Sequence, residues 1–146
     1  MLNSINCLVC NKKCKKNAVK YCSLKCLANY KWQETVKEIE KNNGFAPKDS
    51  YGRVRVMRRY LLQTRGTGCA CCGLTIWQNH PIPLIMDHID GNALNNTLSN
   101  LRLICCNCDG LSSTYKGRNR GKGRSYRRDR YLKIIDVNKK EGNNGK

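Results

Sequence analysis

Two C-x-x-C pairs place the strongest constraint on what this chain can fold into. Cys69 and Cys72 form the first pair, and Cys105 and Cys108 form the second, 33 positions further along. Four thiolates from two such pairs match a tetrahedral zinc site. The spacing exceeds that of an ordinary zinc ribbon, and the insert contains D-H-I-D-G-N with His88. We therefore expect a zinc site that brackets a functional insertion. Since four cysteines already complete the site, His88 as a zinc ligand is the weaker alternative.

A second cysteine set lies near the N-terminus. A C-x-x-C pair is followed by Y-C-S-L-K-C, and the four candidate zinc ligands are Cys7, Cys10, Cys22 and Cys26. The Ser23 hydroxyl is expected to cap a helix that begins at Leu24. Cys14 fits the spacing less well, and a cluster of unligated buried thiols is the alternative. Cys71 and Cys106, inside the central pairs, are expected to stay outside the metal sites.

Composition limits the core and the compartment. Hydrophobic residues make up 40% of the 146 residues, this share includes 11 cysteines, and the mean hydropathy is −0.65. Such a chain builds a small core that metal or disulfide must hold together. We find no apolar run of the ~18 residues that a membrane span needs and no secretory signal pattern at the start. We expect a cytoplasmic protein that uses its cysteines for metal, with no membrane partner.

The net charge indicates the kind of partner. The chain carries a formal charge of +18. Each site of four thiolates and one Zn²⁺ carries about −2, which leaves roughly +14 if both sites are filled. A polyanion, above all a nucleic acid, is the expected partner. A ribosome-associated or merely soluble basic protein is the alternative.

The chain divides into four expected segments: a zinc finger at 1–32, a helical connector at 33–66, a core at 67–116 and a basic tail at 117–146. Within the connector, residues 51–63 read as an amphipathic helix whose Arg58 and Arg59 are candidates for phosphate contacts. The tail is expected to track phosphates, although a disordered solubilising tail would have the same composition. The candidate DNA-binding residues around the tail are Lys116, Arg118, Arg120, Lys122, Arg124, Arg127 and Arg128.

The core is expected to contain a strand at 84–88, a turn at D-G-N (90–92) and a second strand at 100–104, paired as a hairpin. A short helix should then run from Asp109 through the S-S-T-Y segment. Trp77 is expected to cover the small core. His80 is expected to be exposed and incidental, and Asp90 to be structural.

The segments D-H-I-D-G-N and N-L-R-L-I-C-C-N-C-D, with the flanking C-x-x-C-G, resemble the HNH endonucleases of bacteriophages and bacteria. The resemblance extends back to R-R-Y-L-L and forward to T-Y-K-G-R-N-R-G-K-G-R. The N-terminal cysteine pattern also occurs in some phage-type members. The resemblance implies a small α+β fold with a ββα-metal core, activity on double-stranded DNA, and a location in a bacterial cell or a phage-infected host.

Carried onto this chain, the resemblance assigns His88 as the general base and Asn100 as the residue that orders the loop between the strands. The last position of the family pattern falls on Asp109 instead of histidine. Asp87 and Asp109 would hold one Mg²⁺ or Mn²⁺, since carboxylates suit hard cations. The expected products carry 5′-phosphate and 3′-hydroxyl ends.

Asp109 also keeps a second hypothesis open: a non-catalytic zinc-finger DNA-binding protein with a degenerate HNH core. An RNA-binding or ribosome-associated zinc protein is the third, weaker hypothesis.

Overall fold

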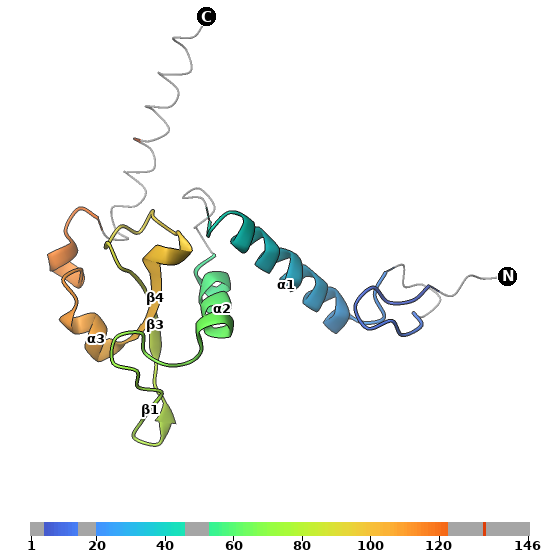
Figure 1. Ribbon diagram of the computed structural model, residues 1–146, viewed down its shortest axis with the longest axis horizontal. Helices are drawn as coiled ribbons and strands as arrows, with labels where there is room; N and C mark the ends of the chain where they lie inside the picture. The colour runs from blue at the N-terminus through green and yellow to red at the C-terminus, as the bar shows by residue number, and fades with distance from the viewer. Residues whose placement is uncertain (1–4, 15–19, 46–52, 123–132, 134–146) are drawn as a thin grey trace, which may run out of the picture. The chain divides into compact units, whose positions relative to one another are not determined.

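The computed structural model describes residues 5–14, 20–45, 53–122 and 133 (Figure 1). It is a small α+β structure with two sheets of two strands each, as expected for the general fold class. The chain forms two compact units, residues 1–42 and 43–146. The expected segment boundary at residue 32 falls inside a continuous helix, and the division into four segments stays a prediction.

The first unit consists of a cysteine-bearing loop and one helix. The loop is closed by an antiparallel bridge between Asn6 and Lys13. Helix α1 (Leu24–Lys41) follows, and the Ser23 hydroxyl accepts a hydrogen bond from the Cys26 amide at 3.3 Å. The predicted cap is therefore confirmed, and it fixes Cys26 in the first turn of the helix.

The second unit begins with helix α2 (Val54–Arg65), which buries Met57, Tyr60 and Leu61. These positions recur at helical spacing, so one face of the helix is apolar and the arginines lie elsewhere. The helix predicted at 51–63 is confirmed from Val54 onward, while residues 51 and 52 lie outside the described part of the chain.

The centre of the second unit is an antiparallel pair of strands, β3 (Leu84–His88) and β4 (Leu101–Cys105). The register pairs Leu84 with Cys105 at one end and His88 with Leu101 at the other. Helix α2 packs against β4, and helix α3 (Cys106–Leu111) contacts both strands. Figure 1 shows α2 and α3 flanking the strand pair. The order strand, strand, helix thus frames the segment that carries His88.

The strands expected at 84–88 and 100–104 are confirmed as an antiparallel pair, and the D-G-N turn lies within the connecting loop, residues 89–100, which ends in the short 3-10 helix η2 (Leu98–Asn100). One expectation about this centre needs correction. Helix α3 begins at Cys106 and ends at Leu111, instead of running from Asp109 through Tyr115. It begins early because the chain turns directly from β4 into the second cysteine pair.

Trp77 does not cover the core as expected. It belongs to a small hairpin of β1 (Ile76–Trp77) and β2 (His80–Pro81), and it is 53% exposed. The fully buried side chains of the second unit, Leu61, Leu101 and Ile104, come from α2 and β4. Those elements supply the core without the tryptophan.

Across the described residues, no helix combines the length and the hydropathy that a membrane span requires.

Candidate metal centres and active site

Two groups of four cysteines gather their sulfur atoms, one in each unit. In each group all four sulfur atoms lie within 4.8 Å of one another. The groups are those predicted from the spacing: Cys7, Cys10, Cys22 and Cys26, and Cys69, Cys72, Cys105 and Cys108.

The sulfur spacings fit zinc. A Zn–S bond of about 2.3 Å in a tetrahedral site sets the S···S distance at about 3.8 Å. In the first group, Cys22 Sγ lies 3.5 Å from the sulfurs of both Cys10 and Cys26, and those two lie 3.8 Å apart. In the second group, Cys72 Sγ lies 3.9 Å from Cys105 Sγ. Both groups therefore have the composition and the size of structural zinc sites.

Backbone amides prepare one thiolate in each group. The pKa of Cys7 is lowered to about 6, chiefly by the backbone amide of Cys22. Burial raises the pKa of Cys69, but backbone amides of Cys72, Cys105 and Cys71 outweigh it and lower the pKa to about 6. The amide of Cys105 donates to Cys69 Sγ at 3.3 Å. Since zinc binds the thiolate and not the thiol, these amides favour the metal-binding form.

Two other thiols, Cys22 and Cys108, need a cation to ionise. Hydrogen bonds to Cys10 and Cys26 raise the pKa of Cys22 to about 12, and hydrogen bonds to Cys105 and Cys72 raise the pKa of Cys108. A divalent cation at the centre of each group would replace these sulfur–sulfur hydrogen bonds and remove the repulsion between thiolates.

The second cysteine group stabilises one end of the strand pair. The amide of Ala70 donates to the carbonyl of Leu103 at 2.8 Å, which ties the first knuckle to β4. Cys105 ends β4 opposite Leu84, whereas His88 lies at the far end of β3. The cysteine group therefore anchors one end of the strand pair, and the loop at residues 89–100 occupies the other. Cys71 and Cys106 are exposed and belong to neither group.

Asn100 is the centre of a hydrogen-bond network inside this loop. Its side chain is 8% exposed. Nδ2 donates to Asp90 Oδ1 and to the Asn95 carbonyl, both at 2.8 Å, and Oδ1 accepts from the Asp90 amide at 3.0 Å. These three side-chain hydrogen bonds join Asn100 to Asp90 and Asn95, ten and five residues earlier, so one side chain fixes the path of the loop.

The Asp90 carboxylate is held within the same network. It accepts from the Asn92 amide at 2.7 Å, from Asn95 Nδ2 at 2.8 Å and from Asn100. Burial raises the pKa of Asp90, but these hydrogen bonds outweigh it and the pKa is lowered overall. The carboxylate is therefore ionised at neutral pH and turned into the loop, in keeping with the structural part expected of it.

His88 has a partner that the sequence reasoning did not identify. Its Nε2 lies 3.1 Å from Oδ1 of Asn96, and Asn96 Nδ2 donates to the Leu94 carbonyl at 3.3 Å. Because the second contact turns the amide oxygen of Asn96 toward the ring, a neutral His88 carries its proton on Nε2 and keeps a lone pair on Nδ1. Asn96 is 8% exposed. The sequence signal is the asparagine-rich run after the histidine, which by itself predicts a loop with local side-chain hydrogen bonds and no contact to His88.

Other segments hold this loop in place. Arg65, at the end of α2, donates to the carbonyls of Leu98 and Leu101. The Leu98 amide donates to the Asn43 carbonyl at 3.1 Å, and Asn119 Nδ2 donates to the Gly91 carbonyl at 2.8 Å. Residues from before α2 and from after α3 thus meet at the loop that carries Asn96 and Asn100.

The two carboxylates expected to bind the catalytic cation lie on different elements of the second unit. Asp87, on β3, forms an ion pair with Arg102 on β4, with 2.7 Å between Asp87 Oδ2 and Arg102 Nε. Asp109 lies on α3. Among the described residues, Asp87, His88 and Asp109 do not form a third group of metal-ligating side chains.

The basic residues proposed for DNA contact are exposed wherever the structure describes them. Arg58 and Arg59 lie on α2, and the described candidates that follow α3 are Lys116, Arg118, Arg120 and Lys122. The pKa of Lys116 is raised by its Tyr115 neighbour, so its charge is secure at neutral pH. The remaining candidates, Arg124, Arg127 and Arg128, lie outside the described residues.

The second unit combines a histidine at the end of a strand, a loop ordered by a buried asparagine, and a neighbouring four-cysteine group. A segment with these three features resembles an HNH endonuclease. A comparison with curated proteins confirms that resemblance. The chain is 48% identical over 54 residues to the H-N-H endonuclease F-TflIV of Escherichia phage T5. The match spans 37% of this chain and 24% of the length of the phage protein. No protein-family model matches the chain, and no solved structure matches it.

Proposed function

We propose that this protein is a metal-dependent endonuclease of the HNH type that hydrolyses phosphodiester bonds in double-stranded DNA. The observation that carries the proposal is the 48% identity to a phage H-N-H endonuclease. The net charge of +18 supports a polyanionic substrate. The expected products carry 5′-phosphate and 3′-hydroxyl ends.

In this proposal His88 acts as the general base. The hydrogen bond from Nε2 to Asn96 supports this role, because it leaves the Nδ1 lone pair to accept a proton from the attacking water. Asn100 acts as a positioning residue, since its hydrogen bonds hold the loop that contains Asn96. The water then attacks phosphorus while its proton passes to the imidazole. The P–O3′ bond breaks, and the leaving 3′ oxygen takes up a proton from solvent to give the 3′-hydroxyl.

Asp87 and Asp109 are proposed to hold one Mg²⁺ or Mn²⁺. Their donor chemistry fits, because carboxylate oxygens are the ligands that such hard cations prefer. Oδ2 of Asp87 is engaged with Arg102, so Asp87 would have its other oxygen left for the cation. When bound, the cation supplies charge stabilisation to the phosphate and the leaving 3′ oxygen. The two four-cysteine groups are proposed to hold structural Zn²⁺.

The DNA contacts are proposed to come from the basic residues of α2 and of the segment after α3. Each phosphate neutralised by a Lys or Arg releases counterions, so affinity should fall steeply with salt. The N-terminal four-cysteine unit is proposed to help position the DNA, since none of its described residues forms a catalytic arrangement.

The test is cleavage of supercoiled plasmid with Mg²⁺ or Mn²⁺. Wild type should nick or linearise the plasmid, and His88→Ala should lose this activity. His80→Ala is the matched control, because His80 is an exposed histidine on β2 and should be dispensable. Equal cleavage by wild type and His88→Ala would refute His88 as the base.

A second candidate function is favoured by Asp109, which stands where the HNH pattern has its last histidine, and by the ion pair that occupies Asp87. Under this hypothesis the protein binds DNA without cutting it. Tight DNA binding with no cleavage of varied DNA substrates by wild type would select this candidate. Competition between duplex DNA and RNA at fixed salt would test the weaker RNA-binding hypothesis.

A further inference from the structure

The β1–β2 hairpin carries apolar side chains that it does not bury. Leu74, Ile76 and Trp77 are 43%, 61% and 53% exposed. The turn at Gln78 and Asn79 has positive φ at both residues, and a two-stranded hairpin has no core of its own. Exposed apolar side chains gathered on one small element indicate a contact surface.

The hairpin also lacks the cationic side chains that a phosphate-binding surface needs. Residues 74–83 contain no Lys, Arg, Asp or Glu, although 26% of the chain is charged. Its aromatic residue Trp77 lies opposite His80 in the register. A nucleic acid that meets this surface presents bases, because its phosphates find no cation there.

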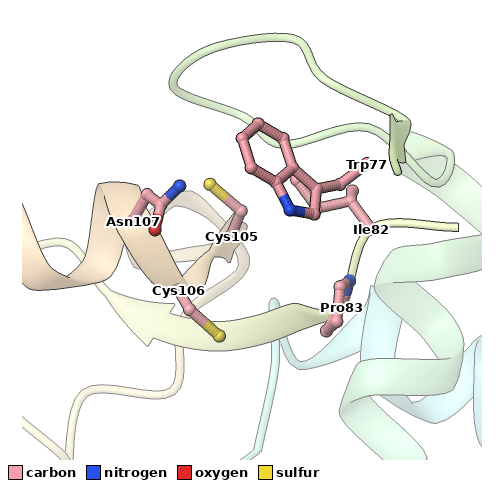
Figure 2. A pocket seen from close by; sticks show the side chains of 6 residues that line it. All are labelled: Trp77, Ile82, Pro83, Cys105, Cys106 and Asn107. Carbon is pink, nitrogen blue, oxygen red and sulfur yellow. The ribbon is translucent and has the colours of Figure 1, made fainter. Parts of the chain in front are cut away.

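A hollow of about 210 Å³ lies between the hairpin and the start of α3. Figure 2 shows the Trp77 indole on the hairpin side and the Asn107 side chain on the α3 side. The other lining residues are Ile82, Pro83, Cys105 and Cys106. Its volume is below the ~300 Å³ at which pockets for drug-sized ligands begin, so it suits a single ring system.

The lining has the chemistry that a nucleobase needs. The indole offers a flat π surface, and the proline and isoleucine offer apolar edges. The Asn107 carboxamide offers a donor and an acceptor to the edge of a base. Arg58, exposed on α2, donates to the carbonyl of Leu84, the residue that follows Pro83. Arg58 does not line the hollow itself, but this contact holds it one residue along the chain from Pro83, which does.

We propose that this hollow binds one unstacked nucleobase of the DNA, with Trp77 as the stacking surface and Asn107 as the hydrogen-bonding partner. The inference rests on the proposed function, since it takes DNA as the substrate. The hairpin is held to the second four-cysteine group, because the Cys69 amide donates to the Leu74 carbonyl at 2.9 Å. The base site is thus built on the same scaffold as the strand pair.

The experiment measures binding to a DNA duplex with a single-nucleotide bulge of 2-aminopurine, without added Mg²⁺ or Mn²⁺ and without chelator, so that zinc stays bound. Trp77→Ala should bind about tenfold more weakly than wild type, as expected for one lost stacking contact. Trp77→Phe should retain most of the affinity. The salt slope of Trp77→Ala should equal that of wild type, because no phosphate contact is lost.

Ile76→Ala is the matched control. Ile76 lies on the same strand and is exposed, but it does not line the hollow. Its variant should bind as wild type, and quenching of 2-aminopurine should disappear in Trp77→Ala alone. Equal affinities of wild type and Trp77→Ala, or equal losses in both variants, would overturn the base site. The base site would also be overturned if wild type sediments as a dimer and the Trp77→Ala substitution dissociates that dimer. If the base site is overturned but wild type still cleaves plasmid, the nuclease proposal stands. If wild type binds no DNA, the base site and the nuclease proposal are both overturned.

Discussion

Arg102 Nε lies 2.7 Å from Asp87 Oδ2, across the register that pairs β3 with β4. The two side chains are 26% and 10% exposed, so the ion pair is partly withdrawn from water. It holds the residue before His88 against the neighbouring strand. A partly buried pair is worth more than a surface pair, and removing one partner leaves a charge that has lost its compensation.

Arg102→Ala should therefore lower the free energy of unfolding by about 1–3 kcal/mol. Urea denaturation of the zinc-loaded protein measures the change. In a double-mutant cycle, adding Asp87→Asn to Arg102→Ala should restore part of the loss, because the uncompensated charge disappears. Strictly additive effects would show that the pair contributes nothing.

Asn100→Ala should destabilise the protein by about 1–3 kcal/mol, because the substitution removes three part-buried hydrogen bonds to polar groups of Asp90 and Asn95. Thermal unfolding is the measurement. Ser99→Ala is the control, since the exposed Ser99 hydroxyl makes one long hydrogen bond, 3.5 Å, to Thr97. Equal melting temperatures for the two variants would contradict the network described for Asn100.

Gly44→Ala tests whether residue 44, which precedes α2, helps to hold the loop at residues 89–100 in place. A Cβ at residue 44 would lie 2.0 Å from the backbone oxygen of Asn96, and the φ of Gly44 is +123°. The loop must shift, and with it the amide that contacts His88, so we expect a loss of about 2 kcal/mol or more in stability together with lower cleavage activity. Gly66→Ala supplies the control, because its φ is +83° but nothing lies within 4 Å of the added carbon. It should cost about 1–3 kcal/mol from backbone strain alone and should leave cleavage activity unchanged. Equal losses of both stability and activity in the two variants would show that the contact with Asn96 does not matter.

Metal content tests the two four-cysteine groups. Wild type should contain two zinc ions per chain, and Cys72→Ser should retain one, because it removes a ligand from the second group. Cys71→Ser, its sequence neighbour outside the group, should retain two. Elemental analysis of purified protein decides between these values. One zinc ion or none in wild type would refute the two-site interpretation.

Acid should release the zinc. The pKa values of Cys7 and Cys69 are lowered to about 6. A thiol whose folded pKa lies below its unfolded value of ~8.5 contributes stability that is present above that value and is lost as the pH falls through the folded pKa. Both residues are therefore ionised at pH 7 even without metal, and bound zinc lowers the pKa of all its ligands further, so zinc should stay bound at pH 7 and be released only at pH values below about 6. A zinc-responsive dye added along a pH series measures the release. Loss of most of the zinc between pH 8 and 7 would contradict this prediction.

The local features of the fold were accessible from the sequence. The Ser23 cap, the apolar face of α2 and the two cysteine groups each follow from residues close together in the chain or from a spacing that zinc imposes. The cysteines 33 positions apart could be grouped because a four-cysteine zinc site needs all four thiolates, whatever path the chain takes between them. The resemblance to HNH endonucleases likewise depended on short segments, and the phage relative confirms it over 54 residues.

Contacts that depend on the register and on the loop path needed the tertiary structure. The Asp87–Arg102 pair exists because β3 and β4 align in one register, and a shift of a single residue would place the two side chains on opposite faces. The Asn96–His88 contact requires residues 89–100 to return toward the strand, which Asn100, Arg65 and Gly44 enforce from separate parts of the chain.

The sequence by itself grouped eight cysteines into two sets of four, which the structure confirms, and singled out His88 and Asn100 as candidate site residues. The tertiary structure alone decided the surroundings of those residues. It gave His88 an asparagine partner, paired Asp87 with an arginine, and exposed Trp77 beside α3. The physical reason is that side-chain chemistry and helical or turn propensity act over a few residues, whereas orientation and burial depend on contacts between segments far apart in the chain.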